Sequence, residues 1–445
     1  MGAHESRLLV DALYGLQTLD PFLSDLIEQP EIQRLRDVRL SNINSGTLPG
    51  AANISRFEHS IGTALLAGRT SIALDLSIVD RHKLVLAALL HDVGITPFGH
   101  MMEEGFAYAE IRYDHEARLH QIFQGEAEHG TLDYQIFRGH SVGFRKVLAK
   151  RVYNPMGIEP ADVMQIIRGE GRLGPLINGT IDLDNIDNVC RMAYHIGIPY
   201  RRGLSGDLAQ VFIVRDDAIL LRGDRVNLIN EWLHLRYRLY SALMTNPTDF
   251  SAKAMLVEAI RLGLCGAGGE KPALSVSNWS LTDSDFIHLL GAYKPTAALI
   301  RRFESGDLFS VVGLNWVDAS RFSSVYPDIP TACRCLRLEV AKKSRVGEDE
   351  VLFYGIRDKR VRPIGRDVWL GLNDSADLLV DGRQQVLLGC VAAKVSHVAK
   401  IRKALIAEIE ARFGAEAYEP CDSDAVLQDV FDSHTIGHGS RGGLF

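Results

Sequence analysis

The stretch KLVLAALLHDVG at 83–94 constrains the fold of this chain more than any other segment. Its apolar run has the texture of a core-packed helix, and that helix ends in the pair His91-Asp92. An imidazole and a carboxylate at such a position need an electrostatic partner, because burying them uncompensated is costly. Neutral imidazole and carboxylate together suit divalent first-row metals. The pair therefore favours a helical domain built around a metal site.

Length and charge limit the classes of protein to which the chain can belong. Its 445 residues exceed the size at which one core usually stops growing, so we expect two or three packed units. A content of 46% hydrophobic and 24% charged residues is typical of a globular protein. The net charge of -7 argues against broad binding to nucleic acid or anionic membranes, although the local arginines Arg34, Arg36 and Arg39 keep nucleic acid as a minor alternative.

The sequence also indicates a compartment. No uninterrupted apolar stretch approaches about 18 residues, and the N-terminus is polar where a secretory signal would be apolar. The six cysteines include no CxxC pair, which favours reduced thiols over a disulfide framework or a zinc ribbon. We therefore predict a cytoplasmic protein without a membrane span.

Helical periodicity dominates the first 260 or so residues, and short β-rich runs appear from about 330. We predict a mainly α fold with a helical core and a smaller C-terminal α+β domain. The β-rich runs are CLRLEV, VLFYGI, VWLGL and QQVLLGCVA, followed by the helix HVAKIRKALIAEIEARFG. Thr282 or Asp283 is expected to cap a helix of the intervening extension. The expected parts are a core at 1–265, a helical extension at 266–325, the α+β domain at 326–418 and a flexible tail at 419–445.

Further ligand candidates accompany the central pair. His59 lies in RFEHS, and Asp184 opens a helix in IDLDNID. Two imidazoles and two carboxylates would leave positions on a six-coordinate metal for water and a phosphate oxygen. Helix capping is the alternative role of Asp184, and Asp182 and Asp187 compete with it as ligands.

An ordered set of motifs carries a resemblance. The motifs are IQRLRDVR at 32–39, PGAANISRFEHSIG at 49–62, LLHDVGITPFGH at 89–100, YDHEARLHQIF at 113–123, NGTIDLDNID at 178–187, LRYRLY at 235–240 and AMLVEAI at 254–260. Together they resemble the HD-domain phosphohydrolases, specifically the dGTPase-like branch of deoxynucleoside triphosphate (dNTP) triphosphohydrolases. The resemblance spans roughly residues 30 to 260 and implies an HD-domain helical core.

The resemblance implies roles for individual residues. The metal ligands would be His59, His91, Asp92 and Asp184, and the ion would be Mn²⁺, Mg²⁺, Fe²⁺, Co²⁺, Ni²⁺ or Zn²⁺. Arg56, His100 and Arg236 would bind the phosphates, since the guanidinium fork of arginine matches phosphate oxygens. His115 would be the proton donor, with Glu116 orienting it and His100 also counted as catalytic. A solvated helix histidine is the alternative interpretation of His115.

The family reaction is hydrolysis at the α-phosphorus, which releases a deoxynucleoside and intact inorganic triphosphate. The resemblance implies a dNTP substrate, a nucleotide effector, and a homo-oligomer, either a tetramer or a hexamer. It also implies a role in dNTP-pool control or phage defence.

Several positions depart from the family pattern. Ile95 stands where the pattern has its middle histidine. Asn185 and Asn188 replace a lysine and a tyrosine that hold the triphosphate, so we assign both to substrate binding with one positive charge fewer. Near the sugar and base, Leu40-Ser41 replaces a Gln-Leu pair, and Met244 replaces a tyrosine.

The departures leave two alternatives to a dNTP triphosphohydrolase. The first is an HD phosphohydrolase on another phosphate ester, such as a nucleoside monophosphate or a cyclic nucleotide. The second is a catalytically silent, nucleotide-sensing oligomer. The metal ligands are retained while substrate-contacting residues change, which favours an active enzyme.

Overall fold

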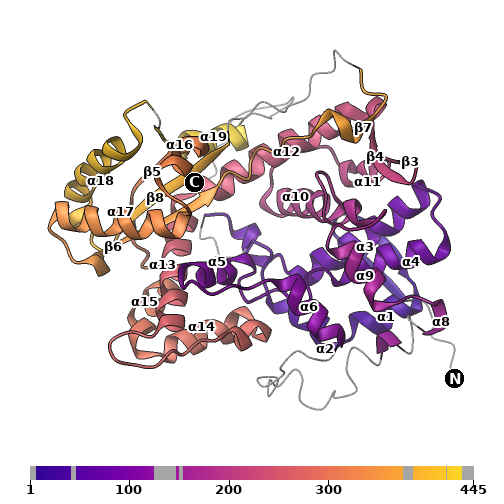
Figure 1. The fold of residues 1–445 in the computed structure, drawn as a ribbon, viewed down its shortest axis with the longest axis horizontal. Coiled ribbons are helices and arrows are strands. Elements are labelled where there is room, and N and C mark those ends of the chain that lie inside the picture. Colours follow the sequence, from indigo (N-terminus) through magenta and orange to yellow (C-terminus); the bar gives the residue numbers. More distant parts are fainter. Residues whose placement is uncertain are drawn as a thin grey trace, which may run out of the picture.

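The computed structural model describes residues 7–41, 47–124, 147–149, 154–373, 384–416 and 418–432. Within these ranges the chain is mainly helical and its strands form three small sheets, which confirms the predicted fold class (Figure 1). None of the helices described there combines the length and apolarity that crossing a bilayer requires.

The N-terminal part is built from helices with two small sheets at its margins. Its helices are α1 (Pro21–Ile27), α2 (Pro30–Gln33), α3 (Arg56–Ala73), α4 (Ile78–Leu90), α5 (His100–Tyr108), α6 (His115–Gln124), α8 (Asn154–Met156), α9 (Pro160–Ile167), α10 (Leu183–Ile196), α11 (Leu204–Leu208), α12 (Val226–Thr245) and α13 (Pro247–Cys265). Its strands are β1 (Arg7–Asp11), β2 (Gly15–Leu19), β3 (Phe212–Arg215) and β4 (Ala218–Arg222).

Three long helices position the predicted motifs. α3 packs against α4 and α10, and α10 packs against α12, around one shared apolar core. α4 ends at Leu90, so His91 and Asp92 begin the connection to α5, which starts at His100. The motif residues therefore lie at helix ends that meet around one point.

Side-chain caps fix where these helices begin. The Ser55 hydroxyl accepts the backbone N–H of Glu58 at the start of α3, and Asp182 accepts that of Asn185 at the start of α10. Thr282 caps α14 with a reciprocal capping box, which confirms one of the two caps predicted for that helix.

The C-terminal part is a sheet covered by helices. Its helices are α14 (Asp283–Ala292), α15 (Lys294–Ser305), α16 (Ala319–Val325), α17 (Ile329–Ser344), α18 (Val398–Phe413) and α19 (Ser423–Asp432), and its strands are β5 (Ser310–Asp318), β6 (Val351–Arg357), β7 (Trp369–Leu370), β8 (Gln385–Ala392) and β9 (Tyr418–Pro420). The four-stranded sheet has the order β6-β8-β5-β9, with antiparallel pairing throughout. α17 and α18 pack against it, and α13 of the N-terminal part packs against it as well (Figure 1). Burial of both faces explains why VLFYGI and QVLLGCVA read as continuous apolar runs.

Two β-strand predictions are wrong. CLRLEV belongs to helix α17, in which the buried residues Cys333, Leu336 and Val340 follow helical spacing that the six-residue run was too short to reveal. VWLGL contributes only Trp369–Leu370, and this strand pairs in parallel with β4 rather than with the C-terminal sheet.

The predicted helical extension and flexible tail also need correction. The range 266–325 contains β5, a strand of the C-terminal sheet, as well as helices. Within the tail at 419–445, α19 packs on α12, and Arg238 donates a hydrogen bond of 2.7 Å to the carbonyl of Val430. The apolar face of α19 packs against the N-terminal core. Residues 433–445 lie outside the described residues. The domain bounds themselves remain predictions.

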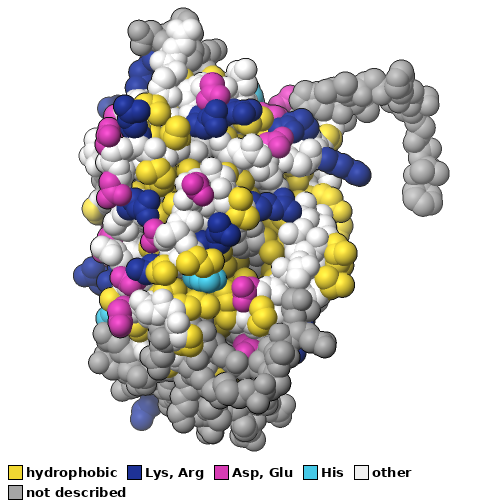
Figure 2. Space-filling model, turned by 90° about the vertical axis from the view of Figure 1, so that its right-hand side faces the viewer, with side chains coloured by type: hydrophobic (Ala, Val, Ile, Leu, Met, Phe, Trp, Pro, Cys, Tyr) yellow, Lys and Arg dark blue, Asp and Glu magenta, His cyan; other side chains and the backbone are white. Residues whose placement is uncertain are grey.

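Charge is mixed on the surface that we can view. On the face in Figure 2, basic side chains are spread among acidic and apolar ones rather than gathered by sign. This agrees with the modest net charge of -7.

Candidate active site

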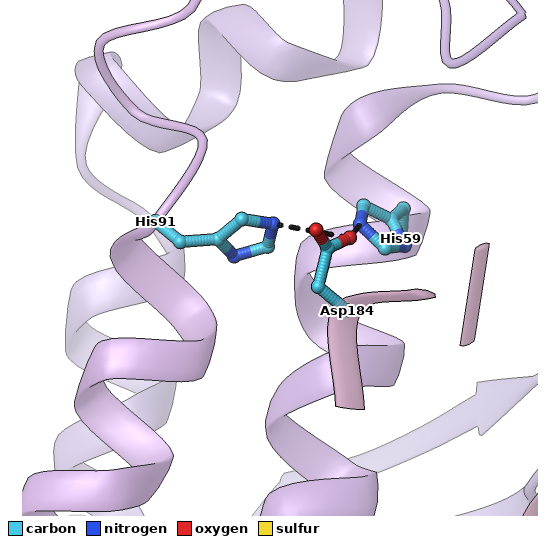
Figure 3. Close-up of side chains that lie close together, drawn as sticks. All are labelled: His59, His91 and Asp184. Atoms are coloured by element: carbon cyan, nitrogen blue, oxygen red, sulfur yellow. Dashed lines mark hydrogen bonds and ion pairs between the residues drawn. The ribbon is translucent and has the colours of Figure 1, made fainter. Parts of the chain in front are cut away.

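A metal-ligating cluster lies where α3, the end of α4 and the first turn of α10 meet. His59, His91 and Asp184 each offer a ligand atom, and these atoms lie within 4.8 Å of one another (Figure 3). His59 Nε2 is 2.9 Å from Asp184 Oδ1, and His91 Nε2 is 3.7 Å from the same oxygen. Both imidazoles thus direct Nε2 at one carboxylate.

The outer nitrogens of the two rings explain this orientation. His91 Nδ1 donates to the carbonyl of Ala88 at 2.8 Å, and His59 Nδ1 lies 2.8 Å from Asp187 Oδ1. Each Nδ1–H is thereby held by a protein acceptor, which turns each Nε2 toward the cluster, where a bound cation would take its lone pair. His91 Nε2 is buried and has no hydrogen-bond partner among the described residues. A divalent cation fits this donor set and supplies the partner that His91 lacks.

The two other aspartates that the sequence offers as metal ligands, Asp182 and Asp187, make different contacts. Asp182 caps α10, as described above. Asp187 lies behind His59 and accepts hydrogen bonds from Arg191 and from the hydroxyl of Tyr14 at 2.9 Å. Burial raises the pKa of Asp187, but Arg191 and His59 outweigh burial and lower it to about 2. Asp187 is therefore an ionised partner that orients His59.

Asp92 adjoins the cluster and is paired with Arg56. Arg56 Nη1 lies 2.8 Å from Asp92 Oδ2, and the same oxygen is 3.6 Å from His91 Nε2. Burial raises the pKa of Asp92, but the charges of Arg56 and the neighbouring histidines hold it well below its usual range. Asp92 therefore stays ionised beside the cluster, and its role as a fourth ligand remains a prediction.

A second cluster contains His100, Glu103 and His115. His100 Nδ1 is 2.8 Å from Glu103 Oε2, and His115 Nδ1 is 2.9 Å from Glu103 Oε1. Burial lowers the pKa of His115, but the hydrogen bond and the charge of Glu103 outweigh burial and raise it to about 9. At neutral pH His115 is therefore protonated, as a proton donor must be.

The structure gives His115 a hydrogen-bond partner other than the predicted Glu116. The carboxylate beside His115 is that of Glu103, whereas Glu116 accepts a long hydrogen bond of 3.4 Å from Asn178. α6 begins at His115 and directs the adjacent Glu116 elsewhere. The only local signal for Glu103 was its position three residues after His100, where the two side chains share a helix face.

One cavity of about 440 Å³ joins both clusters to the predicted substrate residues. It is lined by every residue that we assigned to the site from the sequence: Arg56, His59, His91, Asp92, His100, His115, Glu116, Asp184, Asn185, Asn188 and Arg236. Leu40, Ser41 and Met244 also line it. Ile95, in contrast, is fully buried in the apolar core and offers no donor. The individual roles of these residues remain predictions.

The C-terminal part also contributes to the cavity, which we did not predict. Tyr354, Ile356, Lys359 and Arg362 line it from β6 and the segment that follows. No local pattern marks these residues, because only the packing of β6 against α13 brings them to the site.

A family model for the HD domain matches residues 56–192. The chain carries an HD domain. The HD domain spans the motifs that hold both clusters, which confirms the resemblance seen in the sequence. HD domains are metal-dependent, and the cluster of His59, His91 and Asp184 is a possible metal site, one of two groups among the described residues whose ligand atoms are close enough to share an ion.

Curated relatives extend the similarity beyond the HD domain. The chain is 26% identical to the deoxynucleoside triphosphate triphosphohydrolase SAMHD1 of Homo sapiens over 350 residues, which are 69% of this chain and 55% of that protein. It is 28% identical over 262 residues to the uncharacterized protein YwfO of Bacillus subtilis (strain 168), covering 58% of this chain and 55% of YwfO. A SAMHD1 homolog of Dictyostelium discoideum is 25% identical over 268 residues, or 57% of this chain and 49% of the homolog. The chain spans about half the length of these relatives, and the similarities point to a metal-dependent phosphohydrolase.

Proposed function

We propose that this chain is a metal-dependent dNTP triphosphohydrolase that releases a deoxynucleoside and inorganic triphosphate. The observation that carries the proposal is the pairing of two clusters in one cavity. His59, His91 and Asp184 offer three metal donors, and His115 is held protonated across the same space. The similarity to proteins named dNTP triphosphohydrolases supports the choice of substrate.

The mechanism assigns a task to each part of the cavity. His59, His91 and Asp184, with Asp92 beside them, would hold a divalent ion. Such an ion lowers the pKa of water and neutralises phosphoryl charge. Arg56 lies next to Asp92 and would bind oxygens of the phosphate under attack.

The leaving group needs a proton. As the bond between the α-phosphorus and the 5′-oxygen breaks, His115 would donate its proton to that oxygen. Glu103 would keep His115 charged and oriented through the hydrogen bond at Nδ1, which leaves Nε2 for the substrate. Water supplies the oxygen that ends on the released triphosphate.

A second candidate is an HD phosphohydrolase on another phosphate ester, such as a nucleoside monophosphate or a cyclic nucleotide. Asn185 and Asn188 favour it, because both line the cavity and bring no charge for a polyphosphate. The silent nucleotide sensor is the third candidate. A nucleotide effector, a tetramer or hexamer, and a role in pool control or phage defence belong to the leading proposal.

Product analysis separates these functions. Purified protein is incubated with each of the four dNTPs, singly and mixed, with Mn²⁺ or Mg²⁺, and the products are resolved by ion-pair chromatography. We expect deoxynucleoside plus inorganic triphosphate, lost in His91→Ala and retained in the control His234→Ala, an exposed histidine of α12. Activity only in mixtures would indicate an effector site. Turnover of monophosphates or cyclic nucleotides alone would support the second candidate, and nucleotide binding without turnover would support the sensor.

A further inference from the structure

Basic side chains from outside the HD match converge on the active-site cavity. Arg236 and Lys253 reach it from α12 and α13, and Lys359 and Arg362 reach it from the segment after β6. Burial lowers the pKa of Lys253, and the charge of Lys359 lowers it further. Burial likewise lowers the pKa of Arg236, and Arg362 adds to the effect. Carboxylates such as Asp182 and Glu104 line the same cavity and offset part of this charge, yet four basic side chains gathered there favour an anionic ligand.

Arg362 lines the cavity beside the first turn of α10, which carries the metal-ligand candidate Asp184. Its Nη2 donates to the carbonyl of Gly179 and lies 3.2 Å from Asp182 Oδ2. Asp182 in turn accepts the side-chain amide of Asn185 at 2.9 Å. Asp184, the metal-ligand candidate, lies between Asp182 and Asn185 in the sequence, in the first turn of α10.

Arg236, on α12, contacts the same first turn of α10. Its Nη1 donates to Asn185 Oδ1 at 3.1 Å, so the Asn185 amide links Arg236 to the Asp182 carboxylate that Arg362 contacts. Arg236 is 6% exposed, and its Nε is buried without a hydrogen-bond partner among the described residues. Asn185 therefore bridges Arg236 to the carboxylate that Arg362 contacts, and it supplies an amide where a lysine would repel both arginines.

Donors of Arg362 remain available to a ligand. Only its Nη2 makes a hydrogen bond to a described residue, while the side chain keeps 24% of its surface exposed. A guanidinium in this state has N–H groups that match phosphate oxygens.

We propose that Arg362 is a substrate-binding residue that, with Arg236, holds the polyphosphate end of the substrate. The inference rests on the proposed function and deepens it, because two arginines flanking Asn185 suit a ligand with several phosphates rather than a monoester. It also makes the C-terminal part a component of the active site. A purely structural role, in which Arg362 only ties its segment to Gly179, is the alternative to test.

Binding of inorganic tripolyphosphate tests the inference without catalysis. Isothermal titration calorimetry is run on wild type, Arg362→Ala, Arg362→Lys and the control Arg366→Ala, an exposed arginine that does not line the cavity. We expect about tenfold weaker binding of tripolyphosphate in Arg362→Ala, partial recovery in Arg362→Lys, and wild-type affinity in Arg366→Ala. Orthophosphate should be affected much less.

The outcomes separate this inference from the proposed function. Weaker tripolyphosphate binding in Arg362→Ala supports the inference even when no dNTP is hydrolysed, in which case only the proposed function fails. If dNTPs are hydrolysed, KM should rise about tenfold with little change in kcat. Unchanged tripolyphosphate affinity, with or without a lower melting temperature, overturns the inference. If Arg362→Ala does not fold, Arg362→Gln is measured instead, since it replaces the guanidinium with a neutral amide. Wild-type affinity for tripolyphosphate in that variant overturns the inference equally.

Discussion

The two histidine clusters differ in which ring nitrogen faces the carboxylate. His59 and His91 direct Nε2 at Asp184. His100 and His115 direct Nδ1 at Glu103. The first cluster leaves His91 Nε2 buried without a hydrogen-bond partner among the described residues, and the second gives each ring a hydrogen bond to one glutamate. Two sets of similar side chains in one cavity thus have different needs. The first offers a buried donor set to a cation, and the second holds His115 in its protonated form at neutral pH. The orientation of the imidazoles, more than their number, separates a metal site from an acid.

The largest effect is expected from His91→Ala. It removes the nitrogen that lacks a partner, so the bound divalent metal should be lost and activity should fall by about 10³-fold or more. Metal content per chain and initial rates measure both effects, with His234→Ala as the matched control. Full metal content in His91→Ala would show that the His59–His91–Asp184 cluster does not depend on His91 to bind the metal, which contradicts the assignment of this cluster.

His115→Gln should separate the clusters most clearly. Loss of the proton donor should reduce kcat by about 10²- to 10⁴-fold, while the metal content stays at the wild-type level, because His115 lies outside the first cluster. Rates and metal analysis are made on the same preparation. Loss of metal in this variant would show that the second cluster binds the ion.

Glu103→Gln should change the pH profile. Burial lowers the pKa of His115, but Glu103, with smaller contributions from Asp92 and Glu116, raises it to about 9, so the acid is protonated below about pH 9 and the rate declines above it. Without the carboxylate charge, the pKa of His115 should fall and the alkaline limb should move to lower pH, with about tenfold less activity at pH 8. The measurement is kcat/KM from pH 6 to 10. An unmoved alkaline limb would separate Glu103 from the proton donor.

The smallest effect is expected from Glu116→Gln. Glu116 accepts a hydrogen bond from Asn178 and acts on His115 only through its charge, so kcat/KM should stay within about twofold of wild type and the alkaline limb should move less than in Glu103→Gln. Measured beside Glu103→Gln, this variant tests which glutamate serves His115. A loss equal to that of Glu103→Gln would restore the sequence-based assignment.

The sequence by itself determined the helical class, the HD motifs and those cavity residues that lie within the motifs. These features follow from local spacing, because the ends of α3, α4 and α10 carry His59, His91 and Asp184 as direct consequences of where each helix begins and stops. The apolar periodicity of the helices was equally visible in the residues themselves.

Only the tertiary structure decided which partner each of these residues has. Asp182, Asp184 and Asp187 share one short motif, yet one caps the helix, one faces the metal cluster and one supports His59, because their directions differ by roughly 100° per residue around α10. Glu103 rather than Glu116 is hydrogen-bonded to His115. Arg362, which follows β6 in the chain, contacts Asp182 although the two residues are 180 positions apart in the sequence. Such contacts depend on how distant segments pack, and no local pattern records that packing.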